Sequence, residues 1–344
     1  MPQTPVPLAM LVLDGSHGEG GGQILRSSLS LAICTQQAFR IENLRANRKP
    51  PGLQRQHLAA VRAATQISDA EVSGDEIGSQ TLVFKPGKVR PGSYTFAIGT
   101  AGSATLVLQT VLPPLLSAQR PSTVRVTGGT HNRGAPPFDF LARTFVPQLA
   151  RMGAQVELEL LAYGFYPRGG GEIRAEIQPA ALQPLHLHER GELRRGYADA
   201  YVAGLPMHIA ERELKVIGRV LGWSQDRLNV RVLPNDMGPG NAVTITIEYE
   251  HVAEVITGFG ERGVRAETLA QAAALEAREY LRARAPVGAH LADQLLVPMT
   301  LAGGGSFTTT AVTPHLESNA LVVETFTGRR IRIEPHQEGF RVEC

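Results

Sequence analysis

The sequence predicts an α/β fold built from repeated units, and three observations lead to this prediction. Glycine triplets recur at 20–22, 169–171 and 303–305 in similar local sequence. Segments of helical periodicity alternate with short β-branched runs. Several helical segments lead into stretches of alternating apolar and polar residues, as in strands that are covered on one face. About three or four similar units of strands and helices are therefore expected.

The expected helices and strands follow one another along the chain. Apolar residues at helical spacing predict helices at 23–35, 53–66, 103–116, 138–152, 266–284 and 291–301. Alternation with a period of two predicts strands at 123–127, 155–160 and 172–177.

A small inserted domain is predicted from a change in composition. Residues 179–195 break the alternation with Pro184, histidines and charged residues. Beyond them we expect a strand or loop and then a helix at 200–222, strands at 227–233 and 242–250, and a glycine-rich return at 257–263. We therefore expect a large domain of residues 1–183 and 264–344, interrupted by a small α/β domain of residues 184–263.

Composition limits the class of protein. Of the 344 residues, 43% are apolar and 19% are charged, which is typical of a globular chain and excludes a disordered one. No apolar run approaches the roughly 20 residues of a membrane span. Cys34 and Cys344 are too few for a disulfide framework, and no secretory signal is recognised at the start. We expect a soluble, cytoplasmic protein with no membrane partner.

The net charge of +2 is too small to indicate a nucleic-acid-binding protein by itself. Its distribution is uneven, because residues 40–62 contain six basic side chains against Glu42 alone. The six are Arg40, Arg45, Arg48, Lys49, Arg55 and Arg62. This segment could bind an anionic ligand, and a solvated helix face with a flanking turn is the alternative.

The first candidate motif is a glycine-rich turn at 14–22 that leads into a helix. Backbone amides at such a junction and the positive helix end favour phosphate. The Walker signature is absent, and Val12 stands where lysine-adenylating ligases place their lysine, so another residue must carry any covalent nucleotide. Glu19 could hold a metal and Arg26 a phosphate, and a tight structural turn is the alternative.

Two further loops could contact other parts of a nucleotide. Pro51 and Gly52 begin a helix beside Arg48 and Lys49, where the helix start and the cations favour an anion. The loop 128–138 follows a strand, which is the usual place for ligand contacts in α/β proteins, and its Pro136 offers a flat apolar face to a base. An ordinary helix entry and an ordinary connector are the alternatives.

The fourth candidate motif contains the best candidate nucleophile. Pro314 predicts the start of a helix, where the ring of His315 would lie beside unpaired backbone amides. A neutral imidazole is a competent nucleophile when an acceptor holds the proton of its other nitrogen, and Asp293 is a candidate acceptor. For a histidine taken alone, a capping or core role is the more common one.

The other histidines offer weaker signals. His186 and His188 form an H-x-H pair, but a zinc site needs more ligands, so a surface loop is expected there. No useful neighbours are recognised in the sequence for the remaining ones, which are His17, His131, His208, His251 and His336.

Taken together, the motifs resemble those of the RNA 3′-terminal phosphate cyclase family. The similar segments are HGEGGGQILRSSLSL, RKPPGLQRQHLAAV, AIGTAGSATLVLQTVLPPLL, GGTHNRGAPPFDF, GFYPRGGGEI, HLADQLLVPMTLAGGGSF and PHLESNALVVETF, in register from about residue 11 to residue 326. The resemblance implies three repeated units of β-sheet plus two helices in a large domain, with a small α/β domain inserted before the last unit. The insert inferred from composition lies at the corresponding place.

The resemblance also implies a reaction. His315 would attack the α-phosphorus of ATP, release pyrophosphate and carry AMP, which would then pass to the terminal 3′-phosphate of RNA. The neighbouring 2′-hydroxyl would displace AMP and close a 2′,3′-cyclic phosphodiester. AMP leaves far more readily than a phosphate monoester oxygen, and the adjacent hydroxyl is already within reach. The implied partners are therefore ATP and an RNA with a 3′-terminal phosphate.

Site residues are implied by matching positions. Gln109, His290, Leu291, Ala292, Asp293 and Gln294 match ATP-contacting positions, Pro136 matches the wall under adenine, and Arg26, Arg48, Gln56 and His57 match polar positions of the phosphate site. Glu19 would bridge the ATP phosphates through Mg²⁺ or Mn²⁺. Relatives often show tyrosine where this chain has His290, so adenine would stack on a smaller and titratable ring.

Two alternatives and one open point accompany this hypothesis. A non-catalytic RNA-binding scaffold of the same fold would keep the basic segment and take up no AMP, and a repeat-built enolpyruvyl transferase would bind phosphoenolpyruvate. The presence of His315 favours the catalytic branch. Edge strands of a repeat protein could also pair into a homodimer, which no sequence feature decides.

Overall fold

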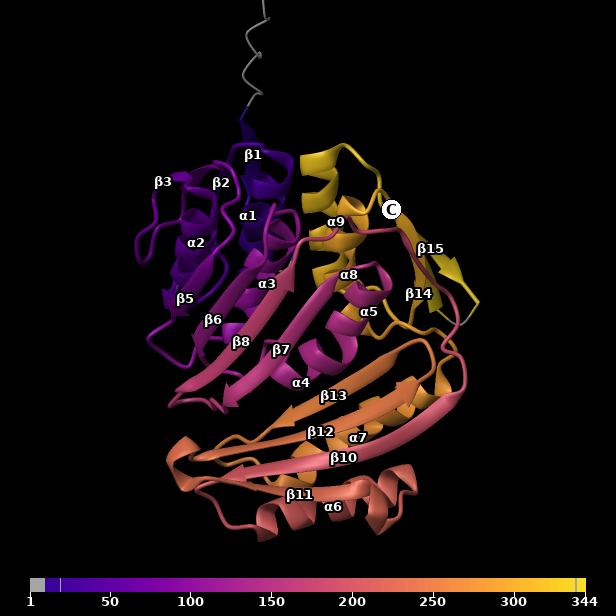
Figure 1. Cartoon of the computed structure of the whole chain (residues 1–344). Coiled ribbons are helices and arrows are strands. Elements are labelled where there is room, and N and C mark those ends of the chain that lie inside the picture. The colour runs from indigo at the N-terminus through magenta and orange to yellow at the C-terminus, as the bar shows by residue number, and fades with distance from the viewer. Residues whose placement is uncertain (1–9, 19, 338) are drawn as a thin grey trace, which may run out of the picture.

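The computed structural model describes residues 10–18, 20–337 and 339–344. These residues form four sheets of four strands each, with helices packed against them (Figure 1). Three of the sheets share one pattern of connections and the fourth belongs to the insert. The predicted α/β class is therefore confirmed.

In each of the three similar sheets, the first two strands along the chain are parallel, and the last two are antiparallel to their neighbours. In the first sheet the order is β1-β2-β4-β3. Its unit consists of β1 (Leu11–Asp14), α1 (Gln23–Thr35), β2 (Phe39–Glu42), α2 (Arg55–Ser68), β3 (Glu71–Ser73) and β4 (Leu82–Lys85).

The second unit repeats this pattern with strand order β5-β6-β8-β7. The helix expected at 138–152 is continuous in the chain but contains a π-helical stretch, η1. The elements are β5 (Ser93–Ala97), α3 (Ala104–Leu116), β6 (Ser122–Gly128), α4 (Phe138–Phe140), η1 (Leu141–Phe145), α5 (Val146–Arg151), β7 (Gln155–Ala162) and β8 (Gly171–Gln178).

The third sheet has the order β15-β16-β14-β9, in which β9 and β14 are parallel. The two parallel strands are far apart in sequence, because the insert separates them. The elements are β9 (Leu185–Leu187), α8 (Ala289–Leu301), β14 (Gly305–Thr309), α9 (Pro314–Thr327), β15 (Arg332–His336) and β16 (Gly339–Glu343).

The insert has a sheet and a hydrophobic cluster of its own, and Figure 1 shows it below the rest of the molecule, next to α4 and β7. Its sheet has the order β11-β10-β12-β13. The elements are β10 (Leu193–Ala203), α6 (His208–Leu221), η2 (Gln225–Arg227), β11 (Leu228–Leu233), η3 (Asn235–Met237), β12 (Gly240–Tyr249), β13 (Ala253–Phe259) and α7 (Ala266–Arg282).

This packing differs from the expected domain boundaries at two places. Strand β9 follows residue 184 but pairs with β14 of the third unit. Helix α7 follows residue 263 but buries Ala270, Ala274 and Ala277 against the insert sheet. The insert thus begins after the first strand of the third unit. The expected boundary missed this strand because β9 is too short to be recognised by its pattern. The glycine-rich return expected at 257–263 begins within β13.

Helix starts are determined by local sequence. The hydroxyl of Thr313 accepts the Leu316 N–H at 3.1 Å and Pro314 occupies the first turn, so α9 begins where expected. The hydroxyl of Ser103 caps α3 in the same way, by accepting the Leu106 N–H at 3.2 Å. Helix α1 packs against α3 and α9, and α8 packs against α9, so the helix starts are brought together in the interior.

Within the part of the chain that the structure describes, no helix combines the length and the apolar character that a membrane span requires.

Gly52 and Gly78 provide a matched test of how tightly the turn before α2 is packed. Both have positive φ, but a Cβ at Gly52 would lie 2.2 Å from the Gly78 carbonyl oxygen, whereas one at Gly78 would meet nothing within 4 Å. We expect Gly78→Ala to cost about 1 kcal/mol of unfolding free energy from backbone strain, and Gly52→Ala at least about 2 kcal/mol. Urea unfolding measures both, and equal losses would contradict the packing described.

Candidate active site

A cavity of about 360 Å³ is lined by the first turns of α1, α8 and α9 and by the side of α3 from Leu106 to Pro113. Gln23 comes from α1, Gln109 from α3, Asp293 from α8 and His315 from α9. The loop 133–137 and strand β13 of the insert complete the wall. Helix N-termini carry unpaired amides and a partial positive charge, so their convergence favours an anionic ligand.

The ring of His315 is held by a bridge across three helices. Its Nδ1 lies 2.5 Å from Oε1 of Gln23, and Nε2 of Gln23 donates to Oδ2 of Asp293 at 2.6 Å. An amide oxygen can only accept, so Nδ1 carries the proton and the lone pair is on Nε2 of the ring. Asp293 was expected to accept from His315 directly; the structure instead inserts the Gln23 side chain between them.

The charge state of His315 suits a nucleophile. Burial lowers its pKa below the ordinary 6.5, and the positive charges of Arg26, His290 and Arg48 lower it further. Burial raises the pKa of Asp293 to about 7, although the Gln23 hydrogen bond and the charge of Arg26 oppose this. The imidazole is therefore neutral at physiological pH.

Arg26 supplies positive charge in the cavity wall. Burial lowers its pKa to about 10, so the guanidinium stays charged near neutral pH. No described residue makes an ion pair or hydrogen bond with it, and a partly buried guanidinium of this kind suits the oxygens of a phosphate.

A pair of glutamines links α3 to α8 across the cavity. Nε2 of Gln109 donates to Oε1 of Gln294 at 2.5 Å, and Nε2 of Gln294 donates to the His290 carbonyl at 2.7 Å. His290 itself is exposed, and its Nε2 lies 3.6 Å from Oε1 of Glu276. The nearby Glu276 carboxylate raises the pKa of His290 above its ordinary value.

Comparison with known proteins gives the family. A sequence model of RNA 3′-terminal phosphate cyclases matches residues 17–333. The chain belongs to the RNA 3′-terminal phosphate cyclase family. The cyclase of that name from Pseudomonas fluorescens is 53% identical to it, over 96% of this chain and 97% of its own length. The one from Koribacter versatilis is 51% identical, over 98% of this chain and 96% of its own length. The one from Salmonella typhimurium is 49% identical, over 97% of this chain and 98% of its own length.

The structure brings most of the cyclase-like site residues together and leaves others outside the cavity wall. The residues that line it are Arg26, Gln109, Pro136, His290, Asp293, Gln294 and His315. Leu291 and Ala292 are fully buried in the main hydrophobic cluster instead. Their side chains therefore hold α8 in place rather than facing a ligand, because α8 presents only one face to the cavity.

The other expected phosphate-site residues lie behind or beside the wall. Oε1 of Gln56 accepts the Ser103 N–H at 2.7 Å and so connects α2 to the start of α3. His57 is buried with its pKa lowered to about 3 by burial and by nearby arginines, and a Cβ at Gly22 would lie 2.5 Å from its Nε2. Arg48 is exposed and acts on His315 through its charge. Glu19 lies outside the described residues.

Part of the cavity wall consists of residues that were not predicted from the sequence. Val255, Thr257 and Phe259 of β13 line the cavity, so the insert forms one side of it. Gln23 was recognised only as part of the glycine-rich motif, although its place at the first turn of α1 marks it as a ligand or a bridge. Asn319, one turn after His315, also lines the cavity, and its Nδ2 donates to the Asp293 carbonyl at 2.6 Å.

His131 was expected to have no useful neighbours, and the structure corrects this expectation. Its Nε2 lies 2.8 Å from Oδ2 of Asp139, and both side chains are buried. Asp139 also contacts Arg143 at 3.0 Å and accepts from the Tyr201 hydroxyl at 3.2 Å. Spacing in sequence does not reveal this contact, because Tyr201 comes from the insert.

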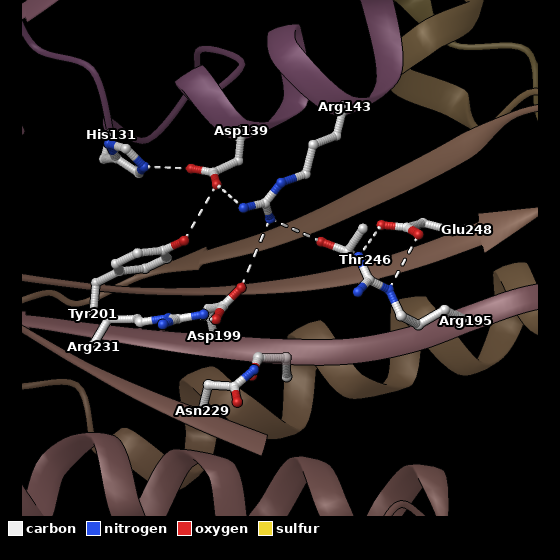
Figure 2. Close-up of polar contacts among 11 residues, drawn as sticks. His131, Asp139, Arg143, Arg195, Asp199, Tyr201, Asn229, Arg231, Thr246 and Glu248 are labelled. Carbon is white, nitrogen blue, oxygen red and sulfur yellow. Dashed lines mark hydrogen bonds and ion pairs between the residues drawn. The ribbon is translucent and has the colours of Figure 1, made fainter. Parts of the chain in front are cut away.

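These contacts continue across the boundary between the insert and the second unit (Figure 2). Arg143 lies 3.8 Å from Asp199, which pairs with Arg231 at 2.8 Å. We call His131, Asp139, Arg143, Asp199, Tyr201 and Arg231 the interdomain network. It fixes the insert sheet against α4 and η1, and so fixes the wall that β13 adds to the cavity.

The interdomain network predicts a large loss of stability when Asp139 is removed. Asp139→Ala leaves Arg143 and the Tyr201 hydroxyl without this partner, which should cost about 3 kcal/mol of unfolding free energy at pH 7. Glu248→Ala removes only a half-exposed pair with Arg195 and should cost less than about 1 kcal/mol. Urea unfolding compares the two variants.

The same prediction has a defined pH dependence. Burial raises the pKa of Asp139, but the hydrogen bond and charge of His131 and the charge of Arg143 outweigh it, and the pKa lies below 3.8. Stabilisation by this carboxylate is present above 3.8 and is lost as pH falls through the folded-state pKa. The difference between wild type and Asp139→Ala should therefore shrink in acid, and a difference that grew there would refute this assignment.

Proposed function

We propose that this chain is an ATP-dependent RNA 3′-terminal phosphate cyclase that works through a covalent histidine–AMP. Membership of the cyclase family supports the overall reaction. The hydrogen bond between His315 and Gln23 carries the proposal of the covalent intermediate, because it leaves a neutral imidazole with its lone pair on Nε2 at a cavity suited to anions.

In the first step, Nε2 of His315 attacks the α-phosphorus of ATP. A phosphorus–nitrogen bond forms, the bond to the bridging oxygen breaks, and pyrophosphate leaves. The imidazole becomes cationic as it attacks, and Gln23 keeps its Nδ1–H bonded throughout. Arg26 and the N-termini of α1, α8 and α9 oppose the negative charge of the phosphates, so the site contributes mainly by positioning and charge neutralisation.

The base would lie between Pro136 and His290. Thr105 donates to the carbonyl of Pro136 at 2.7 Å and fixes that loop. Gln109 and Gln294 lie beside this space and can exchange their mutual hydrogen bond for bonds to a nucleoside. The apolar wall that β13 adds would exclude water from the base.

In the second step, an oxygen of the RNA 3′-phosphate attacks the phosphorus of histidine–AMP, and His315 leaves as the neutral imidazole. In the third, the 2′-hydroxyl attacks the 3′-phosphorus, loses its proton and expels AMP. The product is the 2′,3′-cyclic phosphodiester. The third step joins two groups that are adjacent on one ribose, so it needs little beyond orientation.

We also propose a divalent cation, Mg²⁺ or Mn²⁺, held by the ATP phosphates and Glu19. Among residues 10–18, 20–337 and 339–344, no group of three His, Cys, Asp or Glu side chains is placed to hold a metal. The cation would neutralise phosphate charge when bound.

Covalent labelling tests the proposed intermediate. Incubation with a divalent cation and ATP labelled at the α-phosphate should leave the label on denatured protein, and acid should release it, because a phosphoramidate is acid-labile. His315→Ala should abolish labelling, whereas His208→Ala, at the exposed start of α6, should not. Unlabelled wild-type protein would favour the non-catalytic scaffold instead.

The role of Gln23 predicts a kinetic defect without loss of the nucleophile. Gln23→Ala removes the acceptor that holds the Nδ1 proton, so labelling should slow by at least about tenfold. Gln66→Ala, on the exposed face of α2, should label at the wild-type rate.

The pH profile of labelling checks the same hydrogen bond. At saturating ATP, the wild-type rate should stay constant as the pH falls to 6.5 and decrease only below it, because the pKa of His315 is lowered. A wild-type rate for Gln23→Ala across this range would contradict the proposed tautomer.

A further inference from the structure

Strand β13 of the insert lines the cavity with one face and carries a buried carboxyl group on the other. Val255, Thr257 and Phe259 line the cavity. Glu254 alternates with them and lies on the opposite face, where it is 3% exposed. Its Oε2 has no hydrogen-bond partner among the described residues, which is unusual for a buried carboxyl group.

The Glu254 carboxyl group lies against the start of helix α8. Gly288 is the N-cap of this helix, and a Cβ there would lie 2.4 Å from Oε2 and 2.6 Å from Cδ of Glu254. The backbone of Gly288 has φ −71° and ψ 164°, which any residue can adopt. Space rather than backbone conformation therefore favours glycine here, and the carboxyl group that faces this helix end comes from the insert.

The surroundings hold this contact rigidly. The Arg190 guanidinium donates to the Ala285 carbonyl at 2.8 and 2.6 Å and stacks 4.0 Å from the centre of the Tyr280 ring. The Tyr280 hydroxyl donates to the Pro286 carbonyl at 2.7 Å. The segment between α7 and α8 is thus fixed to the insert immediately before Gly288.

Helix α8 carries three of the residues assigned to the nucleotide. His290, Asp293 and Gln294 lie in its first two turns and line the cavity. A small displacement of the helix start would move all three, and Asp293 would take the Gln23 bridge with it. The contact at Gly288 is therefore placed to control how well the cavity accepts ATP.

We propose that Glu254 is a positioning residue for ATP, acting through Gly288 on helix α8. The proposal rests on the function proposed above and assigns the insert a part in it. Removal of Glu254 should weaken ATP binding, because the start of α8 loses its support. The rate at saturating ATP should stay nearly unchanged, because Glu254 touches no substrate.

The charged groups around Glu254 give the proposal a pH signature. Burial and, less strongly, the charge of Glu276 of α7 raise its pKa, whereas His290, the Gly288 amide and Arg190 lower it; the net result is a pKa of about 8. Tyr280 is the other titratable group that faces it, and its own pKa is raised well above 10 by burial. Glu254 is therefore mostly neutral at pH 7 and becomes charged in alkali, where a buried charge disturbs the helix start.

Steady-state cyclisation and direct calorimetric titration of the full chain with ATP test this. Glu254→Ala should raise the KM for ATP about fivefold, the equivalent of one lost helix cap, with kcat within about twofold. Glu254→Gln keeps the size and the neutral form, so its KM should match the wild type at pH 7. The rise in KM that we expect for the wild type above pH 8 should be absent in this variant.

Glu213→Gln is the matched control. Glu213 is also a fully buried carboxyl group of the insert whose pKa burial raises, to about 7, but it bonds Asn241 at 3.0 Å and does not line the cavity. Its KM for ATP should equal that of the wild type. An equal rise in KM for Glu213→Gln and Glu254→Ala, or an unchanged KM in Glu254→Ala, would overturn the proposal.

Two further measurements keep the test decisive. If Glu254→Ala does not fold, the alkaline KM profile of Glu254→Gln decides alone: loss of the rise supports the proposal and its persistence overturns it. If the wild type cannot be labelled by ATP, the covalent mechanism fails, while ATP titration of the same variants still measures the positioning effect. Failure of the two proposals is thus distinguishable.

Discussion

The bridge from His315 through Gln23 to Asp293 is the interaction on which the site depends, because it connects the starts of α9, α1 and α8. A nucleophilic imidazole has one protonated nitrogen and one nitrogen with a lone pair, and a fixed hydrogen-bond acceptor determines which nitrogen carries the proton. Helix α1 belongs to the first unit, whereas α8 and α9 belong to the third, so the fold must bring the starts of distant helices within hydrogen-bonding distance. Repeated units whose helices pack together in the interior accomplish this.

The insert belongs to this site more closely than its separate sheet suggests. It enters the third unit between β9 and α8, so the chain returns from the insert directly into the helix that carries Asp293. Strand β13 forms one wall of the cavity, and the interdomain network holds the insert sheet against α4 and η1. Packing that stabilises the domain boundary thereby also shapes the place where a nucleotide would lie.

The sequence pattern predicted the helices and helix starts that depend on neighbouring residues. It did not predict the contacts between residues that are far apart in the chain. Helix α1 spans the expected 23–35, and the proline that predicts the start of α9 lies in its first turn. The cluster in which Asp139 contacts His131 and Tyr201 was not predictable, since Tyr201 lies on a strand whose partner surface cannot be inferred from sequence spacing. Strand β9, with three residues, was too short to recognise. Cytoplasmic location and a homodimer stay predictions.

The cavity combines positive helix ends with Asp293 in its wall and Glu254 behind the wall, and the pKa values of these two buried carboxyl groups decide how the opposing charges balance. Burial raises the pKa of Asp293 to about 7 and that of Glu254 to about 8, so near neutral pH both are substantially protonated. Arg26 keeps its charge, because its lowered pKa of about 10 is still well above this range. The wall is therefore more positive than a count of formal charges indicates. A polyanion such as a triphosphate is favoured by this imbalance, which decreases as pH rises and the two carboxyl groups ionise.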